Sequence, residues 1–444
     1  MSDMLSIGAS GVRAYQTALT TTSENIANAG TAGYAKRVAT TREVAVATSG
    51  MTTAANGMGV TVSGIARSGD AMRSADVRAA GADLARSEAG AVWLDRIEGA
   101  LTGNKLDERL TAFFNAATTL SADPSASAPR ATMLQAAASV ANSFAATGAA
   151  LDGAIADLDA SADAGTGQLN TLSASLAKVN AGLGRVAAGT SGQAALLDER
   201  DRLLEAMSAL TDVAVQFDSF GRVSVKGGAG GPLLVQGDRP AIATYARGSD
   251  GAVSFAVYGI DGSHILTPSG GALAGMAEGA ARLADARREL DTIAAAFVEG
   301  VNAVQAGGAD LDGNAGTDMF EGDSAASMKL VLSDPRGIAA AAAGAGPRDN
   351  GNLTALAALR KDGAFESDVT TLTTGNASAL AGRRAIAEVQ TTIRAHAIAA
   401  RDTVSGVNID EEAVDLIRFQ QAYQASSRVI QVARETLDTL FNIR

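Results

Sequence analysis

The chain ends in IDEEAVDLIRFQQAYQASSRVIQVARETLDTLFNIR, residues 409–444. Two rows of residues recur every seven positions in this stretch, and the second row follows the first by three residues. The first row is Leu416, Tyr423, Ile430 and Leu437, and the second is Phe419, Ser426, Ala433 and Leu440. A seven-residue repeat keeps one seam of a helix facing a partner helix and imposes a left-handed supercoil. The C-terminus is therefore predicted to be one long helix that packs as a coiled coil.

The N-terminus carries a shorter version of the same pattern. Its large apolar residues are seven positions apart, and residues 28–33 form a run of turn formers that ends the segment. These apolar residues are Leu5, Val12, Leu19 and Ile26. Ser, Thr, Gln and Ala occupy parts of the seams at both ends, and a helix pair gains its stability mainly from packing. We therefore expect the two terminal helices to pair and to gain further order by packing against other subunits.

A third heptad pattern, in the middle of the chain, predicts either one very long helix or two helices divided near Gly165-Thr166-Gly167. Both versions stay open, because a glycine costs about 1 kcal/mol in a helix interior. The pattern comprises Leu134, Ala137, Ala141, Phe144, Gly148, Leu151, Ile155, Leu158, Ala162, Gly165, Leu169, Leu172, Leu176, Val179, Leu183 and Val186. Further helices are predicted over residues 93–101, 196–210, 283–304, 353–359 and 369–404.

Residues 211–270 change to an alternation of apolar and polar positions. Val213, Val215 and Phe217 alternate, residues 218–221 form a turn, and the alternation then resumes, which is typical of β-hairpins. The predicted fold is mainly α with a small inserted β domain and long coiled-coil-like terminal and middle helices.

This pattern predicts a nested domain order. Residues 1–45 plus 405–444 form a terminal coiled-coil domain, residues 46–210 plus 271–404 a helical middle domain, and residues 211–270 an outer β domain. We expect the β domain at the far tip of the molecule.

The composition excludes several classes of function. The net charge is −12 and no basic run occurs, which argues against a nucleic-acid partner. The absence of cysteine excludes disulfides, thiol catalysis and cysteine metal sites, and two histidines, His264 and His396, cannot form a multi-histidine site. The uncharged stretches 44–66 and 131–151 are diluted by small and polar residues, so no membrane insertion is expected, and the N-terminus lacks the pattern of a secretory signal peptide.

One acidic segment resembles a calcium loop. Asp310 and Asp312 lie at its first and third positions and Glu321 at its twelfth, but Ala315 stands at the sixth position, where an EF-hand needs glycine. A hydrogen-bonded turn is the better interpretation, and no metal site is predicted.

Two other segments could suggest enzyme chemistry. The glycine run 227–231 lacks the Lys-Ser/Thr and the helix of a phosphate loop, so it is interpreted as a loop between strands. The cluster 198–202 contains acids and bases, but Asp198 and Arg202 are four residues apart on a helix and predict a solvated, salt-bridged face. No catalytic residue, no cofactor and no enzyme activity is predicted.

The N-terminal stretch 19–37, LTTTSENIANAGTAGYAKR, resembles the motif of bacterial flagellar rod, hook and hook-associated proteins, with Ala32 where that motif usually has proline. The C-terminal stretch, from SGVNIDEE at 405–412 through RFQQAYQAS at 418–426 to LFNIR at 440–444, is similar to the hook–filament junction proteins of the FlgK family. Residues 57–64, 196–203 and 312–316 resemble the same family.

The resemblance implies an extracellular, structural protein of the flagellum, exported by the flagellar type III apparatus. It implies binding to the hook protein and to the second hook-associated protein, self-association in a ring or helical layer, and an export chaperone on the C-terminal helix. The expected assembly interface comprises Leu5, Val12, Leu19, Ile26, Leu416, Phe419, Tyr423, Ile430, Ala433, Leu437 and Leu440. The alternatives are a hook or rod axial protein and a secreted calcium-binding adhesin that uses Asp310, Asp312 and Glu321.

Overall fold

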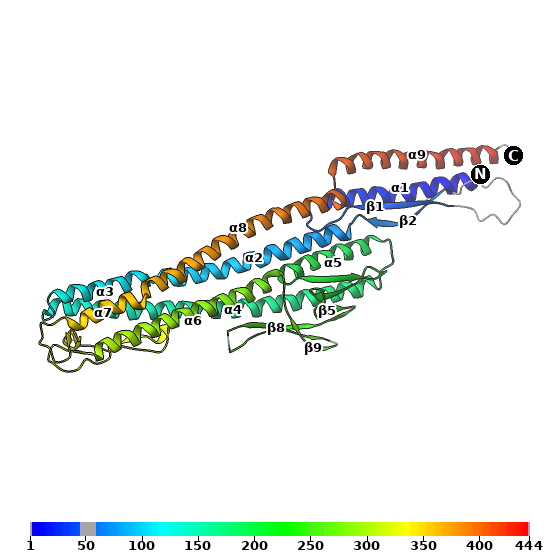
Figure 1. The fold of residues 1–444 in the computed structure, drawn as a ribbon. Coiled ribbons are helices and arrows are strands. Elements are labelled where there is room, and N and C mark those ends of the chain that lie inside the picture. Colours follow the sequence, from blue (N-terminus) through cyan, green and yellow to red (C-terminus); the bar gives the residue numbers. More distant parts are fainter. Residues whose placement is uncertain (1, 45–58, 250, 260, 443–444) are drawn as a thin grey trace.

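The computed structural model describes the backbone of residues 2–44, 59–249, 251–259 and 261–442, with side chains from Met4 to Thr439 in these ranges. The molecule is a long rod of helices (Figure 1). The terminal helices α1 (Ser2–Asn28) and α9 (Ile409–Asn442) lie side by side at one end of this rod. An antiparallel hairpin of β1 (Arg37–Glu43) and β2 (Val60–Arg67), which the sequence pattern does not predict, packs along α1.

Seven helices form the bundle that makes up the rest of the rod. They are α2 (Ala71–Gly103), α3 (Leu106–Ala122), α4 (Ser127–Leu183), α5 (Ser191–Leu210), α6 (Gly271–Ala306), α7 (Gly351–Gly363) and α8 (Phe365–Ser405). The long middle helix is unbroken, because α4 runs for 57 residues through the glycines at 165 and 167. A Cβ at Gly165 would lie 3.0 Å from Cδ2 of Leu273, so this glycine lets α6 approach closely.

Large aromatic side chains fill the core of the bundle at the end far from the termini. Phe297 of α6 lies at the centre of this cluster, with the rings of Phe113 and Phe365 5.5 Å and 5.3 Å from its own. Both contacts are edge-to-face, the geometry that aromatic pairs prefer. Phe114, Phe144 and Phe320 complete the cluster, which joins α3, α4, α6 and α8 into one hydrophobic core.

The inserted β region forms two antiparallel sheets. One contains β3 (Val213–Phe217), β4 (Val223–Gly227), β5 (Leu233–Gln236) and β6 (Arg239–Pro240), and the other contains β7 (Ile242–Arg247), β8 (Val253–Gly259) and β9 (Gly262–Leu266). The glycine run 227–231 connects β4 to β5, as predicted.

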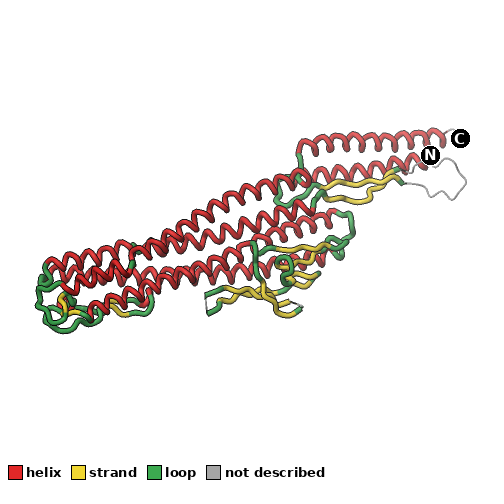
Figure 2. The backbone as a smooth tube through the Cα atoms, viewed as in Figure 1, coloured by secondary structure: helices red, strands yellow, loops and turns green. Residues whose placement is uncertain are grey.

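The expected position of this β region is wrong, since it lies beside α4 and α5 and not at the far tip (Figure 2). The reason is the length of α4, which carries the chain back along the whole bundle before the insert begins. Asn180 of α4, fully buried, then donates from Nδ2 to the backbone oxygens of Val223 and Gly237 and fixes the first sheet against the helix.

Loops from the 307–346 region form the far tip instead. They contain the two-residue strands β10 (Gly308–Ala309), β11 (Phe320–Glu321), β12 (Lys329–Leu330) and β13 (Ala341–Ala342). Arg130, at the start of α4, is buried and donates to the backbone oxygens of Pro124, Arg336 and Ile338. The guanidinium of Arg130 is thus one of the side chains that tie this loop region to the bundle, together with Asn302 and Gln305 of α6.

Candidate functional site

The terminal helix pair is antiparallel and closely packed. Successive contacts join Gly8 to Ile430, Gly11 to Ser426, and the ring of Tyr15 to that of Phe419 at 6.5 Å. A Cβ at Gly8 would lie 2.8 Å from Cγ1 of Ile430, and a Cβ at Gly11 would lie 2.7 Å from Oγ of Ser426. The two backbones are therefore as close as they are because these positions carry no side chain.

The α1 row that faces α9 consists mainly of small and polar residues. It has alternating steps of three and four and comprises Gly8, Gly11, Tyr15, Ala18, Thr22 and Asn25. All of these are buried except Tyr15, which is half-buried. Large apolar side chains do not mark this row, because most of its members are small or polar, and only its heptad spacing is visible in the sequence.

The residues predicted for the assembly interface lie along this pair. Leu5, Val12, Leu19 and Ile26 are half-buried and lie on α1 beside the row that faces α9. On α9, Leu416, Phe419, Tyr423, Ile430 and Leu437 are half-buried, and Ala433 is buried. The side chain of Leu440 is outside the described residues. Most of the predicted interface is thus left partly exposed by the α1–α9 contact.

Asn25 connects four segments at the base of the pair. Its Oδ1 accepts from the backbone N–H of Arg37 at 3.0 Å and from the hydroxyl of Tyr34 at 2.9 Å. Its Nδ2 donates to the backbone oxygen of Arg37 at 2.8 Å and to Glu412 Oε2 at 2.9 Å. With 1% of its surface exposed, Asn25 is a fully satisfied buried amide that joins α1, the following turn, β1 and α9.

The turn between α1 and β1 brings these partners into place. Gly33 adopts φ +81°, a left-handed conformation that favours glycine, and the N–H of Tyr34 donates to the backbone oxygen of Thr31 at 3.1 Å. Burial raises the pKa of Tyr34, against the lowering effect of nearby Arg37, so its hydroxyl remains a donor to Asn25. The guanidinium of Arg37 lies over the Tyr34 ring at 4.7 Å.

Lys36 and Glu412 form an ion pair next to Asn25. The ammonium of Lys36 lies 3.0 Å from Oε1 of Glu412 and 3.3 Å from Oε2 of Glu411. Burial lowers the pKa of Lys36, but its hydrogen bond to the Glu412 carboxylate and the charge of that group outweigh burial, so that the net pKa is raised. The backbone N–H of Lys36 also donates to Ser405, which fixes the α8–α9 connection against β1.

Arginines and aspartates continue this network down to the bundle. Asp198 of α5 accepts from Arg37 at 3.0 Å and from Arg67 at 2.6 Å, and Arg67 also reaches Asp201 at 2.9 Å. The predicted Asp198–Arg202 pair is therefore wrong: Arg202 pairs with Glu199 on an exposed, salt-bridged face, while Asp198 is turned toward the hairpin. The cause is long-range, since the partners of Asp198 come from more than 130 residues away. We call the set Asn25, Lys36, Arg37, Arg67, Asp198, Asp201 and Glu412 the joint network.

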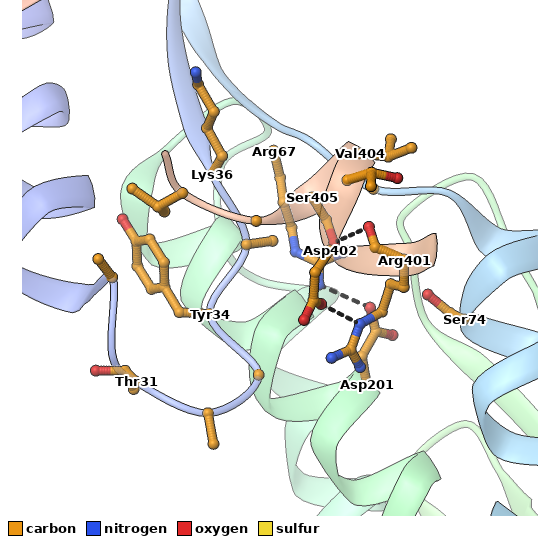
Figure 3. Close-up of a pocket in the computed structure, with 18 of the residues that line it drawn as sticks. Thr31, Tyr34, Lys36, Arg67, Ser74, Asp201, Arg401, Asp402, Val404 and Ser405 are labelled. Atoms are coloured by element: carbon orange, nitrogen blue, oxygen red, sulfur yellow. Dashed lines mark hydrogen bonds and ion pairs between the residues drawn. The ribbon is translucent and has the colours of Figure 1, made fainter. Parts of the chain in front are cut away.

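A cavity of about 650 Å³ lies beside the joint network. Figure 3 shows Tyr34 and Lys36 on one side of it and Arg401, Asp402 and Ser405 from the end of α8 on the other. Arg401 pairs with Glu205 of α5 at 2.6 Å. Several charged groups around the cavity thus join neighbouring segments: Arg401 links α8 to α5, Arg67 links β2 to α5, and Lys36 links the start of the hairpin to α9.

The acidic turn at 310–314 is closed by its own hydrogen bonds. Asp310 Oδ1 accepts from the backbone N–H groups of Asp312 and Asn314, both at 2.8 Å, and Arg336 pairs with Asp312. Glu321 pairs with Lys329 instead of reaching the turn. Burial raises the pKa of Asp310, but the hydrogen bonds from Asn314 and its neighbours outweigh burial and lower it overall. Within the described residues, no three His, Asp or Glu side chains gather in a way that could hold a metal ion.

The two histidines lie apart. His264 is on β9, near the backbone oxygen of Asp261, and His396 is exposed on α8. None of the helices in the described part of the chain combines the length and the apolar run that crossing a bilayer requires. The candidate functional site is therefore the α1–α9 pair. Its large apolar side chains are half-buried, and the joint network connects it to the helical bundle.

Comparison with known proteins gives this site a context. A family model described as the flagellar hook-associated protein FlgK helical domain matches residues 94–320. A second model, the flagellar basal body rod FlgEFG protein C-terminal, matches residues 402–443 and so covers all of α9.

Complete proteins match as well. Flagellar hook-associated protein 1 of Escherichia coli (strain K12) is 24% identical, with 100% of both chains covered. The protein of the same name from Bacillus subtilis (strain 168) is 25% identical over 97% of this chain and 96% of its own. The flagellar hook junction protein FlgK from Burkholderia pseudomallei, a solved structure, shares the fold with a TM-score of 0.50 at 21% identity, over 56% of this chain and 46% of that chain. Because the FlgK helical-domain model matches half of it, the chain belongs to the FlgK family of flagellar hook-associated proteins.

Proposed function

We propose that this chain is a structural subunit of the junction between the flagellar hook and the filament side, and that α1 and α9 carry its assembly. One observation above all supports the proposal that α1 and α9 carry the assembly. The α1–α9 pair is closed by a row of small and polar residues, while large apolar side chains such as Leu19, Tyr423 and Ile430 remain half-buried. Covering these side chains with neighbouring subunits would remove more apolar surface from water, the main favourable term in association.

The proposed binding partners are those expected of a protein at the hook junction. Relatives are named for association with the hook and for a hook junction. We propose that this chain binds the hook protein on one side and the second hook-associated protein on the other, and that copies of it form a ring or helical layer. Heterologous contacts between identical subunits generate such assemblies.

The domain arrangement is proposed on the same basis. The terminal helices, residues 1–45 plus 405–444, form the inner wall of a tube. The helical domain, residues 46–210 plus 271–404, forms the next shell, and the β domain, residues 211–270, faces outward. The position of the joint network supports this division, because it lies where the terminal pair meets the bundle.

Before assembly, α9 is proposed to bind an export chaperone. Its large apolar residues, including Phe419 and Ile430, are half-covered by α1 alone and would be available to such a partner. A chaperone in this place would shield the side chains that later contact other subunits.

The test compares two neighbouring substitutions on α9. Ile430→Asp places a carboxylate in the half-buried seam, whereas Gln431→Asp places the same group on the exposed side of the same turn. In cells that lack the native chain, the first variant is expected to abolish filament attachment and swimming, and the second to support both. The single tryptophan, Trp93, is buried in the bundle and reports by fluorescence that both variants fold there. Normal swimming with Ile430→Asp would contradict the proposed role of α9.

A hook or rod axial protein is the second candidate, because the rod-protein model also matches α9. Immuno-electron microscopy separates the two. A thin labelled band at the distal end of the hook supports the junction role, and label along the hook or rod supports the alternative.

A further inference from the structure

Arg78 of α2 is a buried arginine whose guanidinium has no direct partner. Only 7% of its surface is exposed, and its side chain forms no hydrogen bond or ion pair with any residue in the described part of the chain. An arginine keeps its charge in a protein, and burying a charge that is not paired is costly. The guanidinium of Arg78 therefore has N–H donors that the fold itself leaves unused.

The carboxylates nearest to Arg78 are already paired with other arginines. Asp201 and Glu205 of α5 act on Arg78 through their charge, but neither forms an ion pair with it. Asp201 lies 2.6 Å from Arg200, and Glu205 lies 2.6 Å from Arg401. Burial lowers the pKa of Arg78, and the two carboxylates oppose this effect without cancelling it. The fold thus surrounds Arg78 with acids that other guanidinium groups already neutralise.

A second arginine, Arg394 of α8, reaches α2 near the same place. A Cβ at Gly81 would lie 3.7 Å from Nε of Arg394. Arg394 is exposed and forms no ion pair with another described residue. Gly81 follows Arg78 by three residues, and residues at this spacing are neighbours on the surface of a helix. One buried and one exposed guanidinium therefore lie within about one turn of each other along α2.

The cavity beside the joint network borders the same stretch of α2. Ser74, four residues before Arg78 and on the same face of the helix, lines this cavity together with Asp201 and Arg401 (Figure 3). The volume of about 650 Å³ is ample for a small solute. A solute in this part of the cavity would lie close to Arg78.

We propose that Arg78 and Arg394 bind a small tetrahedral oxyanion of the phosphate class between α2 and α8. The planar fork of a guanidinium matches the oxygens of a phosphate and donates two hydrogen bonds to them. Arg78 supplies a charge already removed from water, and Arg394 closes the site from the solvent side. The bound anion gives the buried charge its partner and joins the two helices next to the joint network.

The affinity is expected to be modest. The chain carries a net charge of −12, which opposes the approach of an anion, and Asp201 and Glu205 lie near the site. A dissociation constant in the submillimolar range is therefore expected for inorganic phosphate.

Isothermal titration calorimetry of the full chain with inorganic phosphate tests the proposal. The native chain is expected to bind one phosphate, Arg394→Gln to bind it at least tenfold more weakly, and Arg78→Met to show no measurable binding. Arg109→Gln is the matched control, because Arg109 is exposed on α3 and also forms no ion pair with a described residue. A native chain that takes up no phosphate, or equal binding by Arg394→Gln and Arg109→Gln, would overturn the proposal.

Thermal unfolding gives a second readout, which a purely structural role of Arg78 would not produce. In chloride, Arg78→Met is expected to be at least as stable as the native chain, because it removes a buried charge that lacks a partner. Phosphate at the same ionic strength is expected to raise the Tm of the native chain by about 2–4 °C more than that of Arg78→Met. The comparison subtracts the general stabilisation of folded proteins by phosphate. Equal shifts in the two proteins would contradict a specific site.

The calorimetry of Arg394→Gln decides the question if Arg78→Met does not fold, since Arg394 is exposed. This site and the junction role stand or fall separately. A chain without phosphate binding keeps its proposed place in the flagellum, and a chain that immunolabelling finds away from the junction keeps the oxyanion site.

Discussion

The far end of the bundle and the terminal helix pair are both helical, but they are closed in opposite ways. The bundle core is filled by phenylalanines from four helices, with Phe297 fully buried among them. The terminal pair is closed by glycines and one asparagine, and its large side chains stay half-exposed. The difference shows that one part of this chain completes its own core, whereas the other leaves large apolar side chains half-exposed, as the proposed assembly through α1 and α9 requires.

The largest effect is expected from Phe297→Ala. Removing this ring leaves a cavity among five aromatic neighbours and is expected to lower the free energy of unfolding of the bundle by about 3–5 kcal/mol. Trp93 fluorescence in a denaturant titration measures it. Phe220→Ala, at a ring that is 57% exposed on the β region, serves as the control and is expected to change stability by no more than about 0.5 kcal/mol. An equal effect of the two variants would contradict the view that the phenylalanine cluster holds the bundle.

The next effect is expected from Asn25→Ala. It leaves the backbone groups of Arg37 and the carboxylate of Glu412 without their amide partner, at about 1–3 kcal/mol for a buried unpaired group. The loss is expected in the terminal pair alone, so hydrogen exchange of α9 amides speeds up while the Trp93 transition stays in place. Asn28→Ala, which removes hydrogen bonds only within α1 and its C-terminal turn, to the backbone of Glu24 and from the hydroxyl of Thr31, is the matched control. A shifted Trp93 transition with Asn25→Ala would mean that the two regions are not separable.

Smaller changes in stability, of opposite sign, are expected from Gly8→Ala and Gly153→Ala. Alanine favours a helix by about 1 kcal/mol over glycine. At exposed Gly153 no atom lies within 4 Å of the new Cβ, so stability rises, whereas at Gly8 the Cβ meets Ile430 at 2.8 Å and α9 must shift. Exchange of α9 amides is expected to speed up only with Gly8→Ala. If the α9 amides exchanged more slowly in Gly8→Ala, the close approach of α1 and α9 at Gly8 would not limit the stability of the helix pair.

The smallest effect is expected from alkaline pH at the β region. Burial and the hydrogen bond to Asp159 raise the pKa of Tyr245 to about 12. Since the folded state keeps this proton at a pH where the unfolded chain has lost it, stability falls as pH rises from 10 toward 12. Absorbance at 295 nm follows the titration, and Tyr245→Phe is expected to remove the last tyrosine to ionise. If the last-ionising tyrosine persists in that variant, the assignment to Tyr245 is wrong.

The sequence predicted the elements whose signal is local. The heptad rows identified α9 and, from Leu134 on, the helical path of α4 but not whether it is one helix or two, and the alternation at 213–217 identified the β region. The hairpin of β1 and β2 was missed although Val60 and Val62 alternate, because a strand of this length also needs a partner, and its partner lies across residues 45–58. These residues are outside the described part of the structure, and Gly57 and Met58 of the family-like segment 57–64 are among them.

The joint network could not be predicted in this way. Asn25 bonds to Glu412 across nearly the whole chain, and Asp198 bonds to Arg37 and Arg67 across more than 130 residues. A local pattern instead favours partners on the same helix, which is why Asp198 was assigned to Arg202.

The unbroken α4 has a mechanical consequence. One helix of 57 residues belongs to both hydrophobic cores, the phenylalanine cluster at the tip and the core shared with the β sheets. A twist applied at one end of this strut travels along a continuous ladder of backbone hydrogen bonds, with no loop to absorb it. The two cores are therefore expected to turn together as one stiff body, whichever end of α4 the torque is applied to.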